Sequence, residues 1–180
     1  MIKTLYLDLA INLLVGLSIP LAARDRVRSG AGYFNRYLCA VLLFELFVFM
    51  PVGAYLFSVY PDWTMMYVVD PALYKFLTPI SVSCFYLAAA LAGYSLAYFA
   101  CRAGKDKVAV AALVAALLAL GAVSLFGIFR LCSVGSFAQW HSGSAMTFIL
   151  QSPLSRDMAV IVAWFVVVLG AIHWKIRRGW

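Results

Sequence analysis

One stretch of the sequence, residues 37–59, reads YLCAVLLFELFVFMPVGAYLFSV and contains a single charged residue, Glu45. A helix needs about 20 mostly apolar residues to cross the hydrocarbon core of a bilayer. Four more stretches meet this requirement, namely residues 4–23, 77–101, 108–129 and 158–174. The sequence therefore predicts an all-α integral membrane protein, in which residues 1–180 form one domain with a bundle of five transmembrane helices.

The composition supports the bilayer as the solvent of this chain. Hydrophobic residues make up 66% of the sequence and charged residues 12%, with a mean hydropathy of +0.96. A soluble domain carries about 45–50% apolar and about 25% charged residues, so a water-soluble domain is excluded. The formal net charge is +7, but the basic residues fall in short clusters between apolar runs. No continuous basic surface for nucleic acid is therefore expected.

The distribution of Lys and Arg predicts the orientation of the helices. Ten of the 14 basic residues lie in the connections 24–36 and 102–107 and in the tail after residue 174. Cytoplasmic segments carry the excess of positive charge, so the N-terminus is expected outside and the C-terminus in the cytoplasm. This pattern is typical of a bacterial-type inner or plasma membrane.

The two predicted outer connections, residues 60–76 and 130–157, are longer than the inner ones. Loops longer than about 12–15 residues tend to carry function or structure of their own. The first is expected to contain a short interfacial helix, and the second is expected to fold back onto the bundle as a lid. The outer-face candidates are Asp62, Asp70, Arg130, Trp140 and His141.

Polar residues inside the predicted spans are the strongest functional signal, because charged groups in hydrocarbon are costly. Glu45 lies about 12 Å from the cytoplasmic edge, and Asn12 and Tyr86 lie about 12–14 Å below the outer edge. No basic residue shares the depth of Glu45, so this carboxyl is expected to be protonated at neutral pH. With Asp8 these residues form a predicted ion or ligand pathway. The alternatives are a neutral Glu45 bonded to a neighbouring helix and an interfacial Asp8–Arg130 pair.

The predicted fourth helix carries small residues at helical spacing, and the spacings Ala111-Ala115-Ala119 and Ala112-Ala116 place them on one side. Such rows let helix backbones approach closely in a membrane. The sequence favours packing of this row inside the bundle. The alternative is docking of a second copy of the chain or of a partner membrane subunit.

The sequence contains no motif that names a reaction. Asp62, Asp70 and His141 lack metal-ligand spacing, and neither a G-x-S-x-G nor a C-x-x-C motif occurs. We therefore expect no catalytic residue, metal or cofactor, and an enzyme is the least favoured class. Two functions remain: a binding or transport module for an ion or small solute, and an accessory or assembly subunit of a larger membrane complex.

Overall fold

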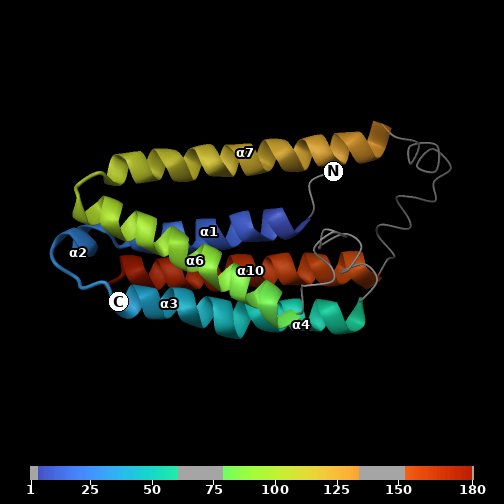
Figure 1. Cartoon of the computed structure of the whole chain (residues 1–180), viewed down its shortest axis with the longest axis horizontal. Coiled ribbons are helices and arrows are strands. Elements are labelled where there is room, and N and C mark those ends of the chain that lie inside the picture. The colour runs from blue at the N-terminus through green and yellow to red at the C-terminus, as the bar shows by residue number, and fades with distance from the viewer. Residues whose placement is uncertain (1–3, 61–78, 134–152, 180) are drawn as a thin grey trace.

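The computed structural model describes residues 4–60, 79–133 and 153–179, and of these residues 4, 5, 7, 79, 80, 123–133 and 153–155 by backbone alone. Every regular element in these ranges is helical (Figure 1). The elements are α1 (Thr4–Ala22), α2 (Arg24–Arg28), α3 (Arg36–Phe44), η1 (Glu45–Phe49), α4 (Met50–Val59), α6 (Pro79–Arg102), α7 (Asp106–Ser133) and α10 (Pro153–Arg177).

Helices occupy all five stretches in which the sequence predicts them, which confirms an all-α helical bundle. Among the described residues, three helices are long and apolar enough to cross a membrane. They are Arg36–Val59, Ser81–Arg102 and Arg156–Arg177. The apolar helix Asp8–Ala22 is shorter.

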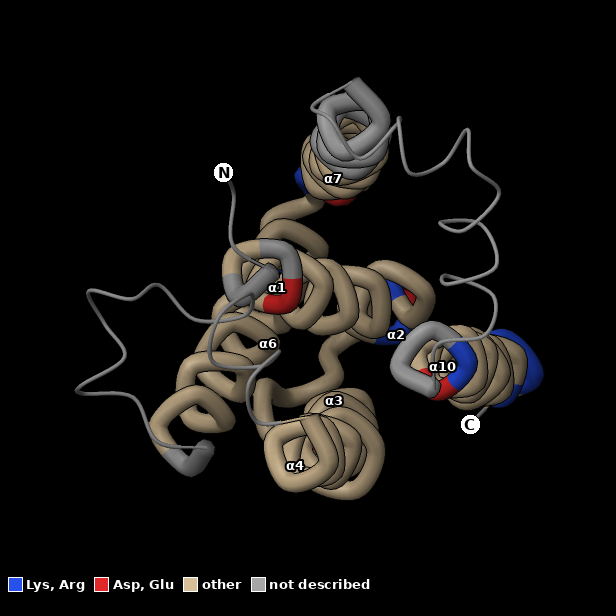
Figure 2. The backbone as a smooth tube through the Cα atoms, turned by 90° about the vertical axis from the view of Figure 1, so that its right-hand side faces the viewer, with Lys and Arg blue, Asp and Glu red and all other residues tan. Residues whose placement is uncertain are grey.

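The pair α1 and α6 lies at the centre of the bundle (Figure 2). The two helices cross at two glycines. A Cβ atom on Gly16 would lie 2.9 Å from the backbone nitrogen of Tyr94 and would overlap the carbonyl oxygen of Ala90. A Cβ atom on Gly93 would lie 3.0 Å from the backbone nitrogen of Leu17. The two backbones are therefore in direct contact, as small residues permit between helices.

The segments α3, η1 and α4 form one continuous helix whose middle turn is a π-helix. The helix begins at Asn35, whose side chain accepts hydrogen bonds from the backbone N–H groups of Tyr37 and Leu38. Pro51 lacks an N–H group, and its ring crowds the carbonyl four residues earlier. The helix accommodates this in the wider turn, where the Met50 N–H donates to the carbonyl oxygen of Glu45. Glu45 thus begins an irregular turn in the middle of the helix.

Tyrosines of α6 hold the connection between α2 and α3 against the bundle. The hydroxyl of Tyr94 donates to the carbonyl oxygen of Tyr33 at 2.8 Å, and that of Tyr98 to the carbonyl oxygen of Ala31 at 2.8 Å. The Tyr33 ring makes edge contacts with both tyrosine rings. Because Tyr94 and Tyr98 are buried, they anchor this connection within the protein.

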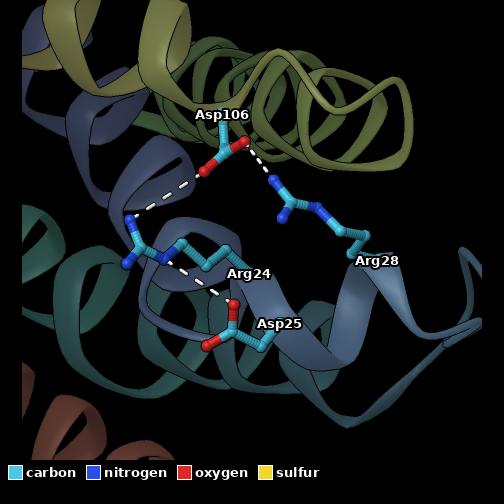
Figure 3. A network of polar contacts seen from close by, with 4 residues as sticks. All are labelled: Arg24, Asp25, Arg28 and Asp106. Atoms are coloured by element: carbon cyan, nitrogen blue, oxygen red, sulfur yellow. Dashed lines mark hydrogen bonds and ion pairs between the residues drawn. The ribbon is translucent and has the colours of Figure 1, made fainter.

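Ion pairs join α2 to the start of α7 (Figure 3). Asp106, 7% exposed, accepts a charged hydrogen bond from Arg28 and lies 3.9 Å from Arg24. Arg24 also pairs with Asp25 at 3.9 Å. We call this region, with the adjoining ends of α6 and α10, the α2 end of the bundle. These pairs neutralise both acidic side chains there.

The helices α7 and α10 lie at the margin of the bundle (Figure 2). The face of α7 that packs inward carries Ala109, Leu113, Ala116 and Leu120. Ala111, Ala115 and Ala119 are exposed instead. The favoured interpretation, packing inside the bundle, therefore holds for Ala116 but not for Ala111, Ala115 and Ala119. Alanines occur on several faces of α7, so their spacing alone does not identify the face that packs inward.

Candidate functional site

Three of the four predicted pathway residues meet where α1 and α6 pack together. The hydroxyl of Tyr86 on α6 donates to Asp8 Oδ2 at 3.2 Å. The side-chain amide of Asn12 donates from Nδ2 to the backbone carbonyl oxygen of Asp8 at 2.7 Å. Asn12 follows Asp8 by one helical turn, so both present their side chains on one face of α1. The sequence predicts that Asp8 and Asn12 share a face of α1, and the structure shows that Tyr86 of α6 contacts this face.

Asn12 is fully buried, and its Oδ1 atom has no hydrogen-bond partner among the described residues. Its amide nitrogen is used by the carbonyl of Asp8, so the oxygen end remains available as an acceptor. A buried acceptor without a donor costs about 1–3 kcal/mol. Buried polar atoms of proteins are normally hydrogen-bonded, so an unpaired acceptor in the interior favours the binding of a donor or a cation there.

Glu45 is buried and carries a carboxyl group without a hydrogen-bond partner among the described residues. Its side chain is 0% exposed, and within the described chain neither Oε1 nor Oε2 has a hydrogen-bond partner. No ion pair joins it to any described Lys, Arg or His. The sequence also allowed a neutral Glu45 that is hydrogen-bonded to a neighbouring helix. No described residue forms such a bond.

An aromatic cluster lies beside Glu45. Phe49, about one turn further along the same helix, contacts the Tyr86 ring edge-on with centroids 5.1 Å apart. Phe165 of α10 stacks on Phe49 at 5.3 Å and is tilted against Phe44 at 5.8 Å. These rings join η1 to α6 and α10 in an apolar setting. They connect the turn that carries Glu45 with the Asp8–Asn12–Tyr86 group.

The chemistry available to these residues is that of oxygen donors. A protonated Glu45 can donate one hydrogen bond and accept others, and an ionised Glu45 can bind a cation. Carboxylate and amide oxygens suit protons and hard cations rather than soft metals. Within the described residues, no three His, Cys, Asp or Glu side chains cluster to hold a metal ion.

The outer-face candidates are not described. Asp62, Asp70, Trp140 and His141 lie outside the described residues, as do the predicted interfacial helix and lid. Arg130 lies in the backbone of α7, and its side chain is not described. The Asp8–Arg130 pair therefore stays a prediction, while Asp8 itself accepts from Tyr86.

One polar contact was not anticipated from the sequence. Asp157, near the start of α10, accepts hydrogen bonds from the hydroxyls of Tyr55 at 2.7 Å and Tyr60 at 2.8 Å. The bond to this carboxylate raises the pKa of Tyr60 to about 12. The contact ties the end of α4 to α10. Its only sequence signal is that the end of the second predicted span and the start of the fifth lie on the same side of the membrane.

No family model, curated protein or solved structure matches the chain.

Proposed function

We propose that the protein is an integral membrane protein of five transmembrane helices, with its N-terminus outside and its C-terminus in the cytoplasm, which binds or transports an ion or small solute at Glu45. The membrane placement is supported by the three long apolar helices and by the clustering of basic residues in alternate connections. A bacterial-type inner or plasma membrane suits this charge pattern.

The observation that carries the functional proposal is the buried, partnerless carboxyl of Glu45. An apolar residue at this position would remove the cost of burying that group. Its position in an irregular π-helical turn favours a role in function, because such turns are frequent at functional sites. A cation or proton bound by Glu45 would supply the partner that the described residues do not.

The route from Glu45 outward is proposed to pass the other polar residues of the interior. Titratable groups on the helices packed against this region include Asp8 on α1 and Tyr86 on α6, which are hydrogen-bonded to each other. Asn12 adds an unpartnered acceptor oxygen on the same face of α1. These groups offer successive oxygen atoms to a small cation or a proton.

Flux measurements in proteoliposomes test this proposal. Proton and sodium flux would be followed between about pH 5 and about pH 9 for the wild type, Glu45→Gln and Glu45→Asp. Glu45→Gln keeps the shape but cannot ionise, so it is expected to fold normally and to lose flux, while Glu45→Asp retains part of it. Asp157→Asn removes a carboxylate at the margin of the bundle and is the matched control. A wild-type dependence of flux on pH in Glu45→Gln would contradict the proposal.

A second candidate function is an accessory or assembly subunit of a larger membrane complex. It is favoured by the exposure of Ala111, Ala115 and Ala119, a small-residue row that a partner helix could meet closely. Ala115→Leu would then lower recovery of a complex from the native membrane without unfolding the chain. Unchanged recovery would count against this alternative.

A further inference from the structure

A groove on α10 is the second feature of the molecule that suggests a ligand. Its volume is about 440 Å³, within the usual range for small-molecule sites of about 300–1,000 Å³. The groove is lined by Trp164, Val167, Val168, Ala171, Ile172 and Lys175. These positions recur every three to four residues, so they form one continuous face of the helix. All are apolar except Lys175, which ends the row.

The length of the groove matches one leaflet of a bilayer. From Trp164 to Lys175 the helix rises about 16 Å at about 1.5 Å per residue. Half of a hydrocarbon core about 30 Å thick is about 15 Å. An acyl chain lying along this face would therefore reach from the middle of the membrane to the level of Lys175.

The groove lies at the edge of the face by which α10 packs on the bundle, because Val168 and Ile172 of its lining pack against the core. Phe165 contacts the aromatic cluster, and Ile176 is 3% exposed at the α2 end. Trp164 and Val167, on the groove, are 51% and 63% exposed. The inner face thus holds the helix in place while the adjoining face offers apolar surface to an occupant.

Basic groups from two elements gather at the α2 end of the groove. The guanidinium of Arg178 lies over the Trp174 ring, 4.2 Å from its centroid. The guanidinium of Arg26 on α2 lies near Gly179, where a Cβ atom would be 3.2 Å from Arg26 Nη2. The acidic groups of this region, Asp25 and Asp106, are already paired with other arginines. The described basic side chains at this end of the groove thus outnumber the described acidic ones.

We infer that this groove binds an anionic phospholipid of the cytoplasmic leaflet, with one acyl chain along α10 and the phosphate at Lys175 and the neighbouring arginines. Basic pockets on the cytoplasmic side of membrane helices recognise anionic head groups in this way. The inference rests on the membrane placement proposed above and is independent of the role of Glu45.

Fluorescence quenching by brominated lipids tests it. The protein would be reconstituted in phosphatidylcholine with a fixed fraction of phosphatidylglycerol or phosphatidylcholine brominated in the acyl chain. The Trp164 signal is obtained by subtracting the Trp164→Phe variant. Brominated phosphatidylglycerol is expected to quench Trp164 more strongly, and Lys175→Gln should lower its relative association constant about fivefold. Val162→Leu, on an exposed position outside the groove, should leave it unchanged.

Each contrary outcome overturns the inference in a distinguishable way. Equal quenching by both brominated lipids would make the groove an ordinary lipid-facing surface. Absence of quenching by either lipid would contradict the membrane placement itself. If an Ala171→Cys variant forms disulfide-linked dimers and the brominated lipids do not quench Trp164, the groove contacts a second copy of the chain instead of a lipid. None of these outcomes depends on flux through Glu45.

Discussion

The crossing of α1 and α6 predicts a large response to one added methyl group. In Gly16→Ala the new Cβ would lie 2.9 Å from the backbone nitrogen of Tyr94 and nearer still to the carbonyl oxygen of Ala90. Both neighbours are backbone atoms, so no side chain can rotate away. The helices themselves must separate.

The expected magnitude follows from that separation. Ordinary contact of a Cβ atom begins at 3.4 Å, so relief of the Tyr94 contact alone needs a separation of about 0.5 Å, and the closer carbonyl oxygen of Ala90 needs more. A gap of about 0.5–1 Å forfeits about a quarter to a half of each dispersion contact across the interface. Overpacking of this kind costs about 1–3 kcal/mol, and we expect Gly16→Ala to fall in the upper part of that range.

Unfolding in mixed micelles with increasing sodium dodecyl sulfate would measure the free energy of unfolding. Gly170→Ala in α10 is the matched control, because nothing lies within 4 Å of a Cβ atom there. That variant should be neutral or slightly stabilised, by at most about 1 kcal/mol, since alanine favours a helix over glycine. Gly16→Ala combined with Gly93→Ala should cost less than the sum of the single changes, because one separation relieves both clashes. Equal stabilities for Gly16→Ala and Gly170→Ala would refute the close crossing.

Three further predictions concern the margin and the ends of the bundle. Ala115→Leu should disturb assembly with a partner more than Val162→Leu, as read by recovery of complexes from membranes; equal recovery would show that the alanine row only faces lipid. Neutralising the arginines of residues 24–28 should weaken or invert insertion, detected by labelling a cysteine added at the C-terminus from outside; unchanged sidedness would contradict the charge argument. Asp157→Asn should lower the pKa of Tyr60 from about 12 toward its ordinary value, because the negative partner that disfavours tyrosinate is removed. Absorbance titration against Tyr60→Phe would detect that shift, and an unmoved titration would exclude the hydrogen bond.

The helical architecture could be predicted because it depends on apolar length and local chain signals. Long apolar runs predicted where helices lie. The sequence could not predict which helices pack closely. Gly16 and Gly93 are isolated glycines in different helices, and only their meeting in three dimensions makes them a contact. The alanines of α7 have the more regular spacing, yet much of that helix is exposed.

The candidate site was partly predictable because the depth of a residue along its helix can be counted from the sequence. Depth along each helix brought Asn12 and Tyr86 to one level, and both contact Asp8. Depth does not give rotation about the helix axis, so the burial of Glu45 beside Phe49 and the lack of a described partner needed the structure. The link from Asp157 to α4 likewise depends on the packing of helices distant in sequence.

The most direct test of the account is the protonation state of Glu45 itself. Infrared difference spectroscopy in proteoliposomes would compare the protonated-carboxyl band between about pH 5 and about pH 9, with and without added sodium, in the wild type and in Glu45→Gln. If Glu45 binds a proton or cation in turn, the wild type should show a carboxyl band that is lost at high pH or with sodium, and Glu45→Gln should lack it. A Glu45 band that stays constant under all these conditions would contradict the account and leave the carboxyl as a neutral part of the packing.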